Sequence, residues 1–90
     1  MKLDSILASC TIVASDINIP DDSETCHVAV CWLQCDGFNP LAAVCCDWLC
    51  TADDVASGAE ELLTIHNDTN NDSMGCRVFT MTGYMARKIL

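Results

Sequence analysis

Cysteine is the residue type that most restricts how this chain can fold, because it supplies 8 of the 90 residues. In a chain this short, such a content predicts either a scaffold held by disulfides or a core in which thiols pack as small apolar side chains. Asp4 interrupts the apolar stretch that a secretory signal needs after its basic start. We therefore expect a cytoplasmic protein, a single compact domain over residues 1–90, with mostly reduced cysteines. Some disulfides remain the alternative.

The spacing of the cysteines indicates neither a zinc ribbon nor a thioredoxin-like site, because Cys-x-x-Cys does not occur. Two Cys-x-x-x-Cys pairs do occur, Cys31/Cys35 and Cys46/Cys50, and on helices each pair would lie on one face. Two such helices packed antiparallel could form two disulfides or a tetrahedral thiolate site. The arrangement resembles the twin Cys-x-x-x-Cys motif of the small chaperones of the mitochondrial intermembrane space, although the additional cysteines depart from that family.

A thiolate zinc site is a second interpretation of the same residues. It would take its ligands from among Cys26, Cys31, Cys46 and Cys50, with His27 nearby. The favoured interpretation is that these cysteines are small core side chains, since cysteine is among the most buried residue types. We therefore expect neither a bound metal nor another cofactor.

The first half of the chain contains two segments of uncertain type. Residues 3–17 fit both a strand and a helix, and the β-branched run at residues 11–13 favours the strand. Residues 24–35 follow a group of acids that suits a helix start, so we expect a helix there, although the apolar alternation also fits a strand.

The next segment gives a clearer signal. Asn39 is a good helix cap and Pro40 suits a first helical position, so residues 41–50 are expected to form a largely buried helix. Its lone carboxylate, Asp47, must reach solvent or find a partner, because an unpaired buried charge is very costly.

Residues 51–64 predict the best-defined amphipathic helix. Thr51 and Asp54 resemble a capping box at its start. The helix has an apolar stripe on one side and an acidic face on the other. The stripe consists of Val55, Ala59, Leu62 and Leu63, and the opposite face of Asp53, Ser57, Glu60, Glu61 and Thr64.

Residues 76–82 are rich in β-formers and predict a strand, which Gly83 ends, and the last residues could add a strand or a helical turn. We expect an α+β domain that is mostly helical, with three central helices and a small sheet from the N- and C-terminal segments. An all-α bundle is the alternative. Trp32 and Trp48 are expected to anchor the core between the first two central helices.

Motifs for catalysis or calcium binding are weak. The loop before the last strand copies the first half of a calcium loop with Asp68, Asn70 and Asp72, but Ser73 stands where the turn glycine belongs and Phe79 where the closing Glu belongs. The sequence has no nucleophile elbow, phosphate loop or paired-His motif. We therefore expect neither a calcium site nor an enzyme.

The charges are distributed very unevenly. The chain has 13 acidic and 4 basic residues, a net charge of −9, and no Lys or Arg occurs between Lys2 and Arg77. Direct contact with nucleic acid needs a clustered basic surface, and binding to anionic membranes needs one too, so neither is expected. A basic partner is compatible with this charge.

In size, acidity and lack of catalytic motifs the chain is similar to small phage-encoded inhibitors, including the anti-CRISPR class. That likeness implies a viral protein that works in a host cytoplasm and blocks a basic nucleic-acid-binding surface by steric and electrostatic occlusion. The alternatives are a secreted disulfide-rich effector or toxin and a small thiolate metal-binding protein, and a homodimer is compatible with the short apolar chain. The expected partner-binding residues are Asp53, Asp54, Glu60 and Glu61, followed by Asp21, Asp22 and Glu24.

Overall fold

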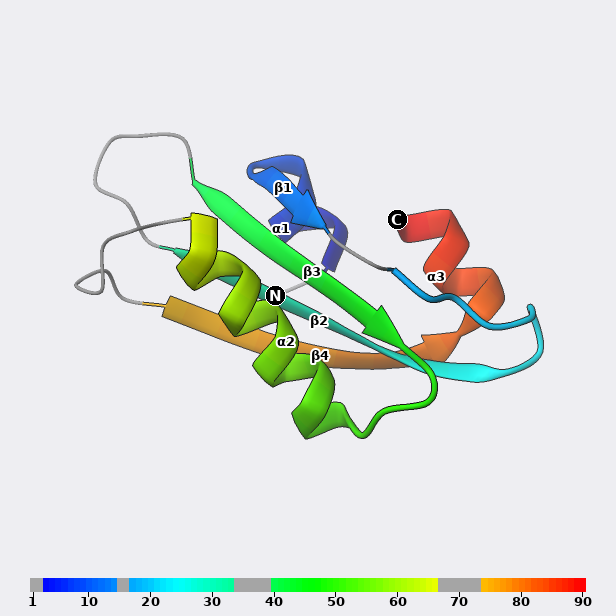
Figure 1. Cartoon of the computed structure of the whole chain (residues 1–90). Coiled ribbons are helices and arrows are strands. Elements are labelled where there is room, and N and C mark those ends of the chain that lie inside the picture. The colour runs from blue at the N-terminus through cyan, green and yellow to red at the C-terminus, as the bar shows by residue number, and fades with distance from the viewer. Residues whose placement is uncertain (1–2, 15–16, 34–39, 67–73) are drawn as a thin grey trace.

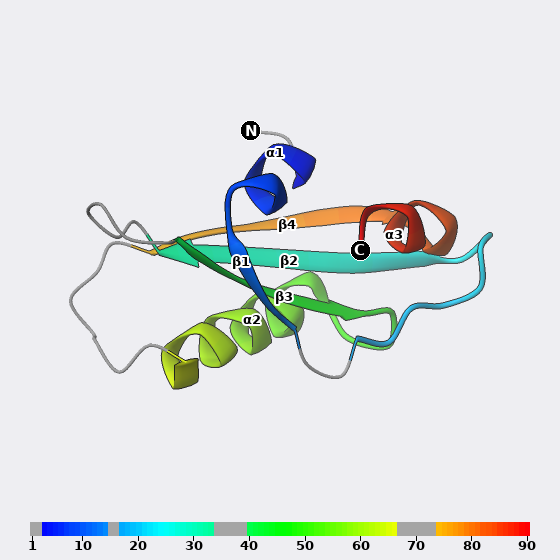
Figure 2. The same cartoon turned by 90° about the horizontal axis from the view of Figure 1, so that it is seen from above.

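A four-stranded sheet forms the middle layer of the protein, with helices on both of its faces (Figures 1 and 2). The computed structural model describes residues 3–14, 17–33, 40–66 and 74–90. The elements in chain order are α1 (Leu3–Ala8), β1 (Thr11–Ala14), β2 (Thr25–Leu33), β3 (Leu41–Asp47), α2 (Ala52–His66), β4 (Met74–Thr82) and α3 (Gly83–Ile89).

The strand order in the sheet is β1-β3-β2-β4. β1 pairs in parallel with β3, while β2 lies antiparallel to both β3 and β4. The expected sheet made of the two terminal segments is therefore wrong, because β1 and β4 occupy opposite edges and each pairs with an interior strand instead.

The expected mostly helical fold, and its all-α alternative, are also wrong. Residues 24–35 and 41–50 were expected to be helices, but they contain the central strands β2 and β3. The error has a physical cause. A strand covered on both faces carries apolar residues on both, so it loses the alternation that identifies a half-exposed strand. Of the three helices within the described ranges, only α2, with 15 residues, is long.

Each face of the sheet has its own core. On one face, α2 packs through Val55, Ala59 and Leu63 onto small strand residues such as Ala29 and Ala43. On the other face, α1 and α3 cover a second set that includes bulkier valines (Figure 2). Buried strand residues of that second core are Cys26, Val28, Val30, Ala42, Val44 and Cys46.

The sequence suggested that the two tryptophans lie between helices, but neither of them does. Trp32 belongs to β2 and packs over Gly75, its register partner on β4, where a Cβ atom would come within 2.4 Å of the indole ring. Trp48 follows β3 and is 41% exposed.

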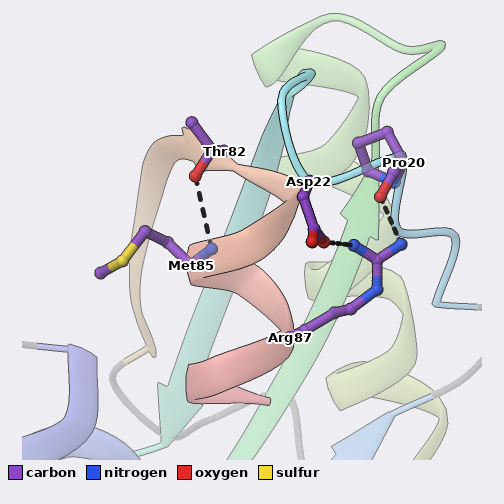
Figure 3. Close-up of polar contacts among 5 residues, drawn as sticks. All are labelled: Pro20, Asp22, Thr82, Met85 and Arg87. Carbon is purple, nitrogen blue, oxygen red and sulfur yellow. Dashed lines mark hydrogen bonds and ion pairs between the residues drawn. The ribbon is translucent and has the colours of Figure 1, made fainter.

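Short helices, α1 and α3, lie near the two ends of the chain. Residues 3–17, for which a strand was favoured, divide into helix α1 and the short strand β1. α3 begins where Thr82 Oγ1 accepts a hydrogen bond from the Met85 backbone N–H, and Arg87 of this helix pairs with Asp22 and the Pro20 carbonyl (Figure 3). Gly83 allows this approach, because a Cβ there would meet the Asp21 carbonyl oxygen at 2.4 Å.

Candidate functional site

The outward face of α2 carries the acids that the sequence singled out. Because Val55, Ala59 and Leu63 turn toward the sheet, the helical period directs Asp53 and Glu61 to the exposed side. The expected apolar stripe is therefore confirmed for Val55, Ala59 and Leu63, and the acidic face for Asp53 and Glu61, whereas the Glu60 carboxylate lies near sulfur atoms of the sheet. Asp53 and Asp54 also lie in the first turn, where carboxylates complement the helix dipole.

Asp54 has a structural role at the start of this helix. Its Oδ2 accepts hydrogen bonds from Thr51 Oγ1 at 2.8 Å and from the Thr51 backbone N–H at 3.3 Å. The Asp54 backbone N–H in turn donates to Thr51 Oγ1 at 3.3 Å. This reciprocal arrangement is the predicted capping box. A substitution of Asp54 would therefore disturb the helix as well as the surface charge.

The second group of predicted acids lies beside α3. The Glu24 carbonyl accepts a hydrogen bond from the Gly83 backbone N–H, and the Asp22 carboxylate pairs with Arg87. Asp21 and Glu24 are exposed. Because α3 and α2 cover opposite faces of the sheet, the structure divides the predicted acids into two separate groups (Figure 2).

The Asp47 carboxylate, at the end of β3, has hydrogen-bond partners, as expected for a lone charge in an apolar segment. Its Oδ1 accepts from the Leu49 backbone N–H at 2.8 Å, and Cys50 Sγ donates to its Oδ2 at 3.3 Å. These bonds favour the charged carboxylate, so the pKa of Asp47 is lowered, chiefly by the Leu49 bond. The same carboxylate raises the pKa of Cys50.

The cysteines fall into two groups on the two faces of the sheet. Cys31 and Cys76 are directly opposed on β2 and β4 and form a disulfide. It belongs to the core under α2. Cys26 and Cys46 are buried thiols on the other face. There burial, followed by the neighbouring Cys26, raises the pKa of Cys46 to about 12.

This division overturns two interpretations of the sequence. The segment that resembled a twin Cys-x-x-x-Cys helix pair contains strands, and Cys31 bonds to Cys76 rather than to another cysteine of that motif; Cys35 lies outside the described residues. The alternative of a zinc site among Cys26, Cys31, Cys46 and Cys50 is excluded, because these residues lie in the cores of opposite faces.

Two features were missed by the sequence reasoning. Glu60 of α2 has a carboxylate oxygen within 4.8 Å of the sulfur atoms of both Cys31 and Cys76. An open groove of about 710 Å³ lies between α1 and α3, where Leu7 and Ile89 supply apolar walls and Asp4 and Lys88 supply charge. The mistaken helices in the middle of the chain hid the first feature, and the strand favoured over residues 3–17 hid the second.

The candidate calcium ligands, Asp68, Asn70 and Asp72, lie outside the described residues. His27 Nδ1 lies 3.1 Å from Thr80 Oγ1 across the β2–β4 pair. Within the part of the chain that the structure describes, no helix combines the length and the hydrophobicity required to cross a membrane.

No protein-family model matches this sequence, and comparison with curated proteins and with solved structures gives no match either. The cysteine-rich small domain therefore has to be interpreted from its own residues and their geometry.

Proposed function

We propose that this chain is a protein inhibitor that binds a basic, nucleic-acid-binding surface of a host complex through the outward face of α2. The observation that carries the proposal is the unneutralised charge of that face. Asp53 and Glu61 are exposed, and the sequence of α2 contains no Lys or Arg. Among the described residues the only ion pair is that of Arg87 with Asp22, on the other side of the sheet.

The shape of α2 supports the same proposal. A helix of 15 residues is about 22 Å long, which is enough to lie along a basic groove. The carboxylates of Asp53, in the first turn, and of Glu61, in the second half of this helix, would meet cations that otherwise contact phosphates, and the charge would also steer the encounter. The backbone of α2 is anchored to the sheet by Val55, Ala59 and Leu63, so these charges are presented at fixed positions.

The alternative of a secreted effector held by several disulfides receives less support. The described residues contain one disulfide, Cys31–Cys76, and two fully buried thiols, Cys26 and Cys46. The proposal accordingly keeps the protein in a reducing cytoplasm, where thiols persist.

The test compares two variants with the same change in net charge. One is Asp53→Lys with Glu61→Lys, on α2, and the other is Asp21→Lys with Glu24→Lys, beside α3. Asp54 is left unchanged because it caps the helix. The immobilised wild-type chain should capture nucleic-acid-binding proteins from a host extract, and duplex DNA should release these proteins again. The captured protein is then purified and titrated with the wild-type chain and with each variant.

We expect the α2 variant to bind this purified partner at least about 100-fold more weakly and the matched variant to bind within about tenfold of wild type. Circular dichroism checks that both variants keep the native fold. Equal weakening by the two variants would show that only total charge matters, and unchanged binding by the α2 variant would reject the proposal.

A further inference from the structure

Two sulfur atoms and one carboxylate meet beneath α2. Cys31 on β2 is fully buried, and Cys76 stands directly opposite it on β4. Glu60 reaches this pair from α2, so that one ligand-type atom from each of the three residues lies within 4.8 Å of the others. Three elements distant in sequence therefore converge on one point between helix and sheet.

Among the described residues, no cation forms an ion pair with this cluster. The nearest basic residue in the sequence, Arg77, follows Cys76 on β4, and strand alternation places its side chain on the opposite face. There its guanidinium lies 5.6 Å from the Phe79 ring centre. A pair of thiolates beside Glu60 would thus carry several negative charges at short range, an arrangement that a metal cation stabilises strongly.

We propose that reduction of the Cys31–Cys76 disulfide converts this cluster into a Zn²⁺ site with the two thiolates and the Glu60 carboxylate as ligands. A dithiol reductant supplies two electrons and two protons, its own sulfurs form a disulfide, and the Cys31–Cys76 bond becomes two thiols. Zn²⁺ then displaces one proton from each thiol and binds both sulfurs and the carboxylate. This site is independent of the proposed inhibitor function.

The ligand types select the class of metal. Thiolates favour Zn²⁺ over Mg²⁺ and Ca²⁺, which prefer oxygen ligands only. Three protein ligands leave a fourth tetrahedral position for water, as in other zinc sites with three protein ligands. Because the disulfide removes two of the three ligands, oxidation and zinc binding exclude each other, and zinc stabilises the reduced chain by mass action.

The experiment uses the full chain with and without reduction by a phosphine. Native mass spectrometry counts bound zinc, and competition with a chromogenic chelator measures its affinity. We expect one tightly bound zinc in the reduced chain and none in the oxidised chain. Co²⁺ in place of zinc should give the intense thiolate absorption of a tetrahedral site.

Variants locate the site. Glu60→Gln retains the disulfide before reduction and should lower zinc affinity at least about tenfold, whereas the matched Glu61→Gln, on the exposed face of the same helix, should not change it. Cys76→Ser should lower affinity more than about 100-fold, and Cys50→Ser should have no such effect.

Several results would overturn the proposal. Zinc held with equal affinity by wild type and Glu60→Gln would show unspecific binding by thiolates, including binding by a chain that unfolds on reduction, because an unfolded chain does not depend on Glu60. Tight zinc binding by the oxidised chain would place the metal elsewhere. If Cys76→Ser does not fold, Glu60→Gln decides alone.

Discussion

The two faces of the sheet are built differently. One face uses small residues, Ala29 and Ala43 on the strands with Ala59 on the helix, so a single long helix approaches closely. The other face presents valines to two short helices, α1 and α3, which leave an open groove between them. The closely covered face holds the cross-strand disulfide with the Glu60 carboxylate near it and also the thiol of Cys50, whereas the looser face keeps Cys26 and Cys46 as buried thiols. The environment of each cysteine, more than the total number, decides its chemistry.

The largest predicted difference between the faces comes from replacing each cysteine pair by alanine. Cys31→Ala with Cys76→Ala removes a bond that spans 45 residues, and the added freedom of the unfolded chain should lower the free energy of unfolding by about 4 kcal/mol. Cys26→Ala with Cys46→Ala removes only two buried sulfur atoms and should cost about 2 kcal/mol. Urea unfolding of both variants and wild type measures this.

A reductant supplies the control for that comparison. In a phosphine, wild type should lose most of its advantage over the Cys31→Ala, Cys76→Ala variant, while the cost of the other pair should stay the same. Equal costs for the two pairs under oxidising conditions would contradict the assignment of the disulfide to the α2 face.

Glycines on the two faces should differ by a smaller amount. Gly83→Ala would drive a Cβ into the carbonyl oxygens of Pro20 and Asp21, which are backbone atoms, and should lower the free energy of unfolding by about 2 kcal/mol. In Gly58→Ala the new Cβ would meet only Cys45 Sγ, at 3.3 Å. The better helix propensity of alanine offsets that close contact. The effect of this substitution should stay below about 1 kcal/mol in urea unfolding. A larger loss of unfolding free energy for Gly58→Ala than for Gly83→Ala would contradict this order and show that the packing around Gly58 adapts less than the packing around Gly83.

The smallest predicted effect is a pH dependence confined to the end of β3. The hydrogen bond from Leu49 lowers the folded-state pKa of Asp47 below its unfolded value of 3.8. Its contribution to stability is therefore present above that value and is lost as the pH falls through the folded pKa. Asp47→Asn should show a smaller loss of stability than wild type when urea unfolding is repeated from neutral to acid pH. Asp53→Asn serves as the control, and the same flattening in that variant would contradict a specific role of Asp47.

The sequence predicted two elements at the periphery of the fold, α2 and β4, and failed on the central strands and on α1. α2 and β4 were found because each keeps one exposed side, which preserves the helical period of Val55, Ala59 and Leu63 and the β-forming run at residues 76–82. β2 and β3 were mistaken for helices because helices cover both sides of these strands. Asn39-Pro40, typical of a helix start, instead precedes β3, where the Pro40 carbonyl accepts a hydrogen bond from Thr11.

The candidate site could be predicted only where it depends on a single helix. The capping box of Thr51 and Asp54 and the exposed acids of α2 follow from local spacing. The meeting of Cys31, Cys76 and Glu60 depends instead on the antiparallel register of β2 and β4 and on how α2 crosses them. The spacing of cysteines along the sequence does not show which of them meet in the fold. The disulfide pairing among the eight cysteines could therefore not be predicted.

The central claim is that the face under α2 holds the Cys31–Cys76 disulfide while the other face holds Cys26 and Cys46 as buried thiols, and peptide mapping of the native protein tests it most directly. The protein is alkylated without reduction, digested and analysed by mass spectrometry. We expect a peptide pair joined through Cys31 and Cys76, and we expect Cys26 and Cys46 to be modified only after unfolding. A link between Cys26 and Cys46, or alkylation of both Cys31 and Cys76 in the oxidised native protein, would contradict it.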